Sequence, residues 1–230
     1  MAPGWYDGGK RVLDLVLATG LLVALSPVMV GCAFAVWWAD GAPVLFRQER
    51  VGRHGRPFRI AKFRTMQAAA GSAVTAAADP RVTPLGRILR GSKLDELPQL
   101  WNVLVGEMSL VGPRPEVPRY AAGAARGFRA IAGLRPGLTD WASLALRDEE
   151  RILARHAGDP HFYQEVLLPR KLALARLYQR HRSLGVDLRL IAATGCLGAG
   201  FSAAARRLAG PGLLDRARRG LGQDRGASVR

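Results

Sequence analysis

The chain has 230 residues, enough for one catalytic domain, and 49% of them are hydrophobic. Its formal net charge of +16 implies an anionic partner, and charge alone leaves open nucleic acid, an anionic membrane leaflet or a diphosphate substrate. Only four of the 34 basic residues are lysines, and arginine favours phosphate recognition because its guanidinium fork matches the phosphate group. Cys32 and Cys196 lie far apart in apolar sequence, which argues against a disulfide framework or a cysteine metal site and fits a reducing compartment.

An apolar run from Leu15 to Ala39 is longer than the roughly 20 residues with which a helix spans a bilayer. Pro27 stands near its middle and removes the helical donor from the carbonyl of Val23, so a kink is expected there, and the hydroxyl of Ser26 can cover that carbonyl. Basic residues flank both ends of the run, and the positive-inside bias therefore draws both ends to the cytoplasm. The sequence predicts a re-entrant helix that breaks at Ser26-Pro27 and leaves the membrane on the side from which it entered.

Beyond this helix, Pro43 to Met66 predicts two strands around the turn-rich GRHGRP, which form a basic hairpin. Gln67 to Ala78 is alanine-rich and lacks large apolar anchors, which predicts a mobile loop. Thr83 and Pro84 fit the N-cap and first position of a helix. From Asp159 a basic amphipathic pattern predicts a helix that lies either on an anionic membrane surface or against the domain core.

The stretch from Ser92 to Pro115 combines an acidic pair, an apolar stripe and a stiff corner. Apolar residues recur in it with the period of one helix face: Leu97, Leu100, Trp101 and Leu104. Ser92 precedes Asp95 as a capping residue would, which places Asp95 and Glu96 at a helix start, where the helix dipole favours their ionised forms. The pair is then either ordinary capping chemistry or a site for anions and cation-phosphate complexes.

The corner Pro113-Arg114-Pro115 fixes the backbone on both sides of one guanidinium. Such a loop holds Arg114 in place at low entropic cost, which favours a binding loop, although prolines also mark purely structural turns.

The segment SKLDELPQLWNVLVGEMSLVGPRPE resembles the signature of the bacterial sugar transferases, the monotopic phosphoglycosyl transferases that load a sugar phosphate onto a polyprenyl phosphate. Further matching segments extend the resemblance over roughly Lys10 to Leu190: KRVLDLVLA, FRQERVGRHGRPFRIAKFRTM, DPRVTPLGRILR, RPGLTDWASL and VLLPRKLALARLY. The chain departs from the common pattern at Lys93, Asp140 and Ser143, where serine, glycine and glutamine are commoner. These departures bear on the identity of the sugar more than on the reaction.

Together with the residue patterns, the resemblance implies an α/β fold, mainly helical with a small β-hairpin, in a membrane-associated single domain with an N-terminal re-entrant helix. Residues 1–40 form the membrane helix, 41–200 a catalytic domain on the cytoplasmic face of the inner membrane, and 201–230 a basic flexible tail. The implied partners are a nucleotide diphosphate sugar, which in this family points to a UDP-sugar, undecaprenyl or another polyprenyl phosphate, and anionic lipids. The resemblance does not imply nucleic acid binding, and it is compatible with a homodimer.

The resemblance also implies roles for individual residues. Asp95 attacks the sugar-bearing phosphate and forms an aspartyl-phosphosugar, and it needs no general base because an unperturbed aspartate, with a pKa of about 3.9, is already ionised at neutral pH. Glu96 is the natural ligand for Mg²⁺. Substrate and phosphate binding fall to the following residues: Lys62, Arg64, Arg90, Pro113, Arg114, Pro115 and Arg147. The product is a polyprenyl diphosphate sugar, as the first step of surface polysaccharide or glycoconjugate assembly.

Alternatives remain open at this stage. A basic membrane-attached nucleic-acid binder explains the charge, and an inactive adaptor would keep the fold without turnover. Ala33-Phe34-Ala35 resembles a signal-peptide cleavage site, and Met29-Val30-Gly31-Cys32 loosely resembles a lipoprotein processing box. Export would leave a nucleotide-sugar enzyme without its cytosolic substrate, which favours the membrane-attached interpretation.

Overall fold

The computed structural model describes residues 4–67, 79–156, 159, 161–198 and 200–210. The loop predicted at 67–78 falls outside these residues except for Gln67. The helices run as follows: α1 (Gly4–Asp40), α2 (Pro84–Ser92), α3 (Gln99–Val105), α4 (Pro118–Gly123), α5 (Ala125–Ile131), α6 (Trp141–Ala145), α7 (Glu149–Arg155), α8 (Leu168–His181), α9 (Leu184–Gly198) and α10 (Ser202–Ala209). The remaining elements are β1 (Leu45–Val51), β2 (Pro57–Phe63), β3 (Ser109–Val111), β4 (Gly137–Thr139), the 3₁₀ turns η1 (Arg53–Gly55) and η2 (Leu94–Glu96), and the π-helical turn η3 (Tyr163–Leu167).

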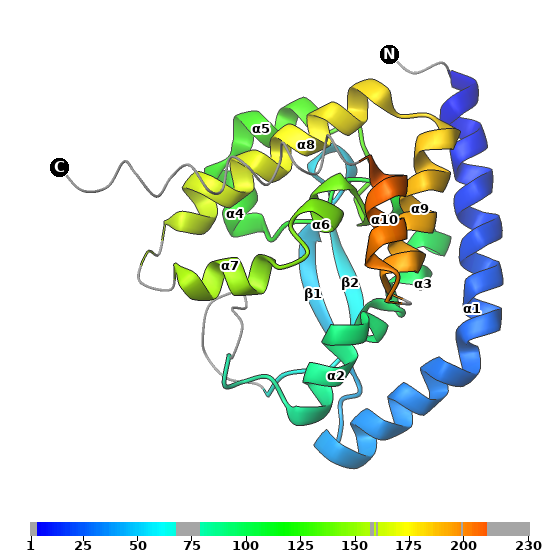
Figure 1. The fold of residues 1–230 in the computed structure, drawn as a ribbon, viewed down its shortest axis with the longest axis vertical. Helices are drawn as coiled ribbons and strands as arrows, with labels where there is room; N and C mark the ends of the chain where they lie inside the picture. The colour runs from blue at the N-terminus through cyan, green and yellow to red at the C-terminus, as the bar shows by residue number, and fades with distance from the viewer. Residues whose placement is uncertain (1–3, 68–78, 157–158, 160, 199, 211–230) are drawn as a thin grey trace.

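The prediction of a mainly helical α/β domain with a small hairpin is confirmed (Figure 1). Strands β1 and β2 pair antiparallel, from Leu45 opposite Phe63 to Val51 opposite Pro57. The structure adds a second sheet in which β3 and β4 pair in parallel. The two segments of this sheet approach each other closely, and a Cβ on Gly137 would lie 2.1 Å from the backbone nitrogen of Gly112. Gly112 directly precedes the Pro-Arg-Pro corner. Glycine is therefore required where this corner is anchored.

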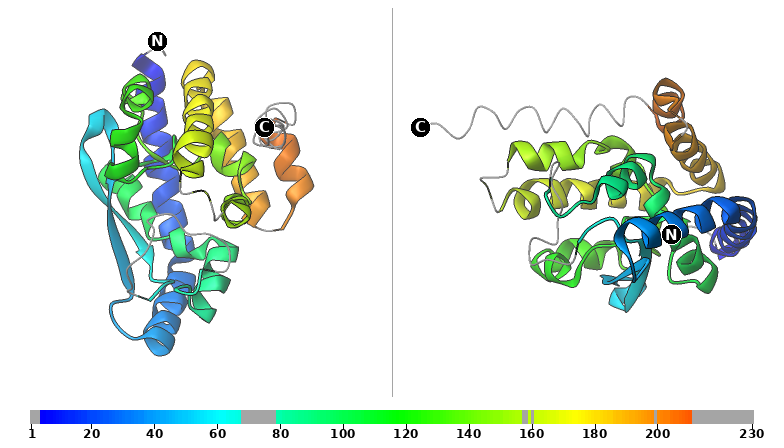
Figure 2. Two further views of the ribbon diagram at one scale, coloured as in Figure 1. Left: turned by 90° about the vertical axis from the view of Figure 1, so that its left-hand side faces the viewer. Right: turned by 90° about the horizontal axis from the view of Figure 1, so that it is seen from below.

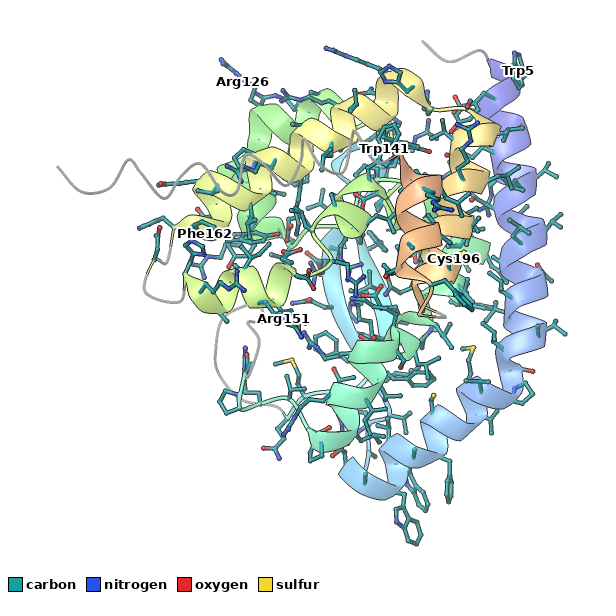
Figure 3. All side chains as sticks on the ribbon, viewed as in Figure 1. Trp5, Arg126, Trp141, Arg151, Phe162 and Cys196 are labelled. Carbon is teal, nitrogen blue, oxygen red and sulfur yellow. The ribbon has the colours of Figure 1, made fainter. Side chains whose placement is uncertain are left out.

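Helix α1 runs for 37 residues, contains Pro27 and is long and apolar enough to cross a membrane by length and composition. The ribbon bends part-way along its length (Figure 1), and Ser26 Oγ donates a hydrogen bond of 2.8 Å to the carbonyl of Val23, as predicted. Its large exposed apolar side chains include the following: Trp5, Val12, Val16, Val23, Val30, Phe34, Trp37 and Trp38. Trp5 points away from the domain at the start of the helix (Figure 3). Such a long unpartnered apolar surface is typical of a membrane contact.

The first turns of α1 nevertheless belong to the domain. Arg11 donates to the carbonyls of Val103 (2.7 Å) and Leu104 (2.8 Å), and it thereby caps the C-terminal end of α3. Buried Asp14 accepts the backbone N–H of Leu110 in β3 at 3.0 Å. These bonds fix α1 to α3 and to β3, the strand that leads into the Pro-Arg-Pro corner.

A buried carboxylate completes this attachment. Asp187 in α9 accepts hydrogen bonds from Tyr6 (2.9 Å), Lys10 (3.0 Å) and Tyr178 (2.7 Å). Burial, followed by the negative charge of Asp187, raises the pKa of Tyr178, so this tyrosine stays protonated and donates to Asp187 at neutral pH. Helices α1, α8 and α9 therefore meet at one polar point inside the core.

The C-terminal helices pack on the same core. Of the two fates left open for the basic amphipathic helix, packing in the core is the one observed for α8, through its apolar side chains Leu168, Leu172, Leu174, Ala175 and Tyr178. The segment 201–230, predicted as a flexible tail, begins instead with helix α10, in which Ala205 and Ala209 are buried. Residues 211–230 lie outside the described part of the chain. Figure 2 shows α10 and the β1–β2 hairpin on opposite sides of the domain.

Candidate active site

The acidic pair lies in the connection between α2 and α3, and its local structure corrects the sequence interpretation. Thr83 caps α2 as predicted and accepts the N–H of Gly86 at 2.9 Å. Ser92 ends this helix, since its hydroxyl donates to the carbonyls of Ile88 (2.8 Å) and Leu89 (3.2 Å), and it therefore does not cap the next one. Asp95 and Glu96 occupy the short turn η2, and α3 begins only at Gln99.

The apolar stripe of α3 also differs from the prediction at one position. Leu100 is buried, and Leu97 and Leu104 pack against the core, whereas the side chain of Trp101 is 61% exposed. The buried stripe is therefore narrower than the four-residue face that the sequence predicted.

Glu96 is held by two cations from distant segments. Lys62 Nζ in β2 lies 2.8 Å from Oε1, and Arg114 grips both carboxylate oxygens, with Nη1 3.2 Å from Oε2 and Nη2 on Oε1. Glu96 is only 8% exposed, and burial by itself would raise the pKa of this carboxyl. Arg114 and Lys62 reverse that effect and hold the pKa well below 4.5, so Glu96 is ionised throughout the neutral range.

Asp95 lies beside this cluster in a different state. It is 6% exposed, and its Oδ1 is buried without a hydrogen-bond partner. Burial raises the pKa of Asp95, and the positive charge of Lys62 offsets that effect only in part, so the expectation that a helix dipole would stabilise its ionised form is wrong. An ionised carboxylate whose oxygen has no hydrogen-bond partner is poorly solvated. Of the two carboxylates, Asp95 is therefore the better candidate for a nucleophile.

Side chains outside the predicted site hold the cations in place. Asn102 joins α3 to β2, the strand that carries Lys62, since its Oδ1 accepts the N–H of Ala61 (3.2 Å) and its Nδ2 donates to the carbonyl of Arg59 (2.8 Å). Asp140 caps α6 through the N–H of Ser143 (2.6 Å) and also accepts the N–H of Arg114 at 3.3 Å. Sequence reasoning missed both roles, although an aspartate just before a helical segment is a recognisable N-cap signal.

The Pro-Arg-Pro corner is clamped from both ends. The carbonyl of Pro113 accepts the N–H of Gly137 at 2.9 Å, and the carbonyl of Pro115 accepts Arg50 Nη1 at 3.1 Å. A cavity of about 270 Å³ opens beside the corner, between the hairpin turn and α5. Its lining includes Arg114, so the cavity borders the residue that grips Glu96.

The structure does not bring the other predicted arginines onto the carboxylates. Arg64 donates to the carbonyls at the end of α1, among them Gly41 (2.6 Å) and Ala42 (2.9 Å). Arg90 pairs with Glu150 of α7. Arg147 is exposed, with Nε 3.9 Å from the carboxylate of Asp148.

Within the described residues, no group of three or more His, Cys, Asp or Glu side chains could hold a metal ion. Mg²⁺ commonly binds through one or two carboxylates together with substrate phosphates, so it does not need three protein ligands. Glu96 is a carboxylate of this kind. Oε1 of Glu96 is occupied by Lys62 and Arg114, but Oε2 accepts a single bond and retains a lone pair. The residues therefore fit an ion shared with a phosphorylated substrate rather than a protein cage.

Comparison with known proteins decides the family. The profile of the family described as bacterial sugar transferase matches residues 5–198, which include α1, both carboxylates and the Pro-Arg-Pro corner. The chain belongs to the bacterial sugar transferase family.

Similar members of the family carry related names. A UDP-glucose:undecaprenyl-phosphate glucose-1-phosphate transferase of Escherichia coli strain K12 is 43% identical over 141 residues, which cover 59% of this chain and 30% of the relative. A protein of the same name from Caulobacter vibrioides is 45% identical over 144 residues, 60% of this chain and 54% of the relative. A UDP-N-acetylgalactosamine-undecaprenyl-phosphate N-acetylgalactosaminephosphotransferase of Aeromonas hydrophila is 38% identical over 160 residues, 64% of this chain and 37% of the relative. The aligned part of the chain thus spans about half or less of these relatives.

The different states of the two carboxylates in this sugar transferase predict opposite effects on stability. Asp95→Asn removes a charge that burial disfavours, and we expect the melting temperature at pH 7 to stay the same or rise. Glu96→Gln leaves Lys62 and Arg114 without their carboxylate and should lower the free energy of unfolding by about 3 kcal/mol. Thermal unfolding of both variants in one detergent measures this difference.

The pH dependence supplies the control. The pKa of Glu96 is depressed in the folded state, so its contribution is fully present above pH 4.5 and is lost as the pH falls below that value toward the folded pKa. The gap between native protein and Glu96→Gln should therefore shrink below about pH 4.5. Equal destabilisation by both substitutions would contradict this assignment.

Proposed function

We propose that this sugar transferase moves a sugar 1-phosphate from a UDP-sugar to a polyprenyl phosphate through an intermediate on Asp95. The observation that carries the proposal is the uncoordinated, buried Oδ1 of Asp95 beside the Glu96–Lys62–Arg114 cluster. The names of the relatives support the two substrates, and those names differ in the sugar. The sugar of this protein is therefore left to experiment.

In the first step, Oδ1 of Asp95 attacks the phosphorus that carries the sugar. The bond from this phosphorus to the bridging oxygen of the diphosphate breaks, and UMP leaves with the bonding electrons. Asp95 then carries the sugar phosphate as an acyl phosphate. No proton needs to be removed from the nucleophile, because the attacking oxygen is a carboxylate.

In the second step, an oxygen of the polyprenyl phosphate attacks the same phosphorus. The acyl phosphate bond breaks, the carboxylate of Asp95 is restored, and the product is polyprenyl diphosphate sugar. Both steps bring one anion against another, so positive charge near the phosphorus lowers both barriers. Lys62 and Arg114 supply part of that charge, and Glu96 holds these cations beside Asp95.

Glu96 is the residue that would hold Mg²⁺, through its Oε2, and the ion would supply further positive charge against the leaving phosphate. Arg64, Arg90 and Arg147 remain proposed phosphate ligands. Arg90 can take that role only after it leaves Glu150, because the pair occupies its guanidinium.

A re-entrant α1 would bring the membrane substrate to the site. The bend and the Ser26 bond to Val23 support a helix that enters and leaves one leaflet, with the catalytic domain on the cytoplasmic face of the inner membrane. Such an arrangement suits the first step of surface polysaccharide or glycoconjugate assembly, where the donor is cytosolic and the acceptor is a lipid.

Release of UMP tests the reaction directly. Native protein with undecaprenyl phosphate should release UMP from one member of a panel that contains UDP-glucose, UDP-galactose and UDP-N-acetylgalactosamine. Asp95→Asn should reduce the rate at least 1,000-fold, roughly the loss seen when a catalytic nucleophile is removed, while it stays folded and membrane-bound. Glu96→Gln should lose less and regain some rate at high Mg²⁺. Native rates in Asp95→Asn would contradict the proposal.

The topology has its own test. Replacement of both Ser26 and Pro27 by leucine should straighten α1 into a full span and move the N-terminus across the membrane, because leucine restores the helical donor and favours helix. Tags at the two ends, probed in sealed cells, report the side of each terminus. A native N-terminus on the opposite side from the domain would rule out the re-entrant helix.

A further inference from the structure

Lys93 occupies the junction between α2 and the carboxylate turn. Its backbone is in the left-handed region (φ +61°), which is uncommon for a residue other than glycine. The Lys93 N–H donates to the carbonyl of Arg90 at 3.2 Å, and the Lys93 carbonyl accepts the N–H of Glu96 at 3.2 Å. The same residue therefore ends the helix and begins the turn that presents Asp95.

The side chain of Lys93 is exposed, and it acts on both carboxylates. Burial raises the pKa of Asp95 and acts in the same direction on Glu96, and the positive charge of Lys93 opposes this effect at both carboxylates, as do the charges of Lys62 and Arg114. Lys62 and Arg114 are bonded to Glu96, whereas Lys93 has no side-chain hydrogen bond or ion pair within the described part of the chain. Its ammonium is thus available to a ligand.

The charge balance of the site favours an additional cation beside Asp95. Asp95 and Glu96 are offset by Lys62 and Arg114, so the cluster is close to neutral before any substrate arrives. A phosphate that approaches Asp95 brings new negative charge within a few ångströms of a carboxylate. An exposed lysine on a flexible stem can follow that phosphate without giving up an existing bond.

We propose that Lys93 is a phosphate-binding residue of the reaction centre, whose ammonium holds the phosphate group that reacts at Asp95. This inference rests on the proposed function. A phosphate reaches Asp95 from two sources, the sugar-bearing phosphate of the UDP-sugar and the phosphate of the polyprenyl acceptor. The two half-reactions of the cycle separate these sources.

The experiment compares three variants of the full chain in phosphatidylcholine nanodiscs. Lys93→Asn removes the ammonium but keeps a residue that tolerates the left-handed backbone, and Lys93→Arg keeps the charge. Arg87→Gln is the matched control, because Arg87 is an exposed cation on the same helix. The first measurement is UMP release from the best UDP-sugar of the panel without acceptor, and the second is discharge of the loaded protein by undecaprenyl phosphate.

In Lys93→Asn, a roughly 10-fold rise in the UDP-sugar concentration needed for half-maximal loading identifies the donor phosphate as the ligand. A roughly 10-fold rise in the undecaprenyl phosphate concentration needed for half-maximal discharge identifies the acceptor phosphate instead. Lys93→Arg should restore most of the loss, and Arg87→Gln should behave as native protein. Native behaviour of Lys93→Asn in both half-reactions would overturn the proposal. A lower melting temperature with equal impairment of Lys93→Arg would also overturn it, because the role would then be structural.

If native protein releases no UMP from any donor, the proposed function fails while Lys93 is still testable. Calorimetric titrations of UDP-glucose and of undecaprenyl phosphate then compare native protein with Lys93→Asn. A roughly 10-fold weaker affinity of the variant for either ligand supports a phosphate-binding Lys93, and equal affinities for both contradict it.

Discussion

The contact between Glu96 and the cations Lys62 and Arg114 is the interaction on which the rest of the site depends. It joins β2, η2 and the loop after β3, three segments that no local sequence pattern brings together. Buried ion pairs add little net stability compared with apolar packing, but the loss of one partner costs several kcal/mol, so the cluster specifies a geometry more than it stabilises the fold. Because Lys62 and Arg114 are bonded to Glu96, they do not pair with Asp95, and the buried Oδ1 of Asp95 has no hydrogen-bond partner.

The same site is coupled to α1, the long apolar helix. Arg11 caps α3, and Asp14 holds β3, so the helix that follows the carboxylates and the strand that precedes the Pro-Arg-Pro corner both rest on α1. Helix α1 is therefore a structural layer of the domain as well as a long exposed apolar surface. A displaced α1 would shift Arg114 and the carboxylates relative to each other, which gives a physical reason for the proposed combination of a membrane helix and a phosphate-transfer site in one unit.

The sequence predicted what local patterns determine. The hairpin, the Thr83 cap and the Ser26 bond to Val23 each depend on a few neighbouring residues, and each was correct. The sequence did not predict burial or long-range partners. The raised pKa of Asp95 and the pairing of Arg90 with Glu150 depend on segments that only folding brings together. The prediction that Ser92 caps the helix after it was wrong because a serine hydroxyl can either bond to the last carbonyls of one helix or cap the start of the next. The local sequence does not distinguish these two roles. The long signature identified the family because it combines many such weak signals.

The central claim is that Asp95 carries the sugar phosphate, and the most direct measurement is to trap and map that intermediate. Native protein is incubated with a radiolabelled UDP-sugar and Mg²⁺ in the absence of polyprenyl phosphate, digested, and analysed by mass spectrometry. The account predicts one phosphosugar on the peptide that contains Asp95, labile to hydroxylamine as acyl phosphates are, and lost when undecaprenyl phosphate is added. A label on another residue, or turnover in one step with no labelled protein, would contradict it.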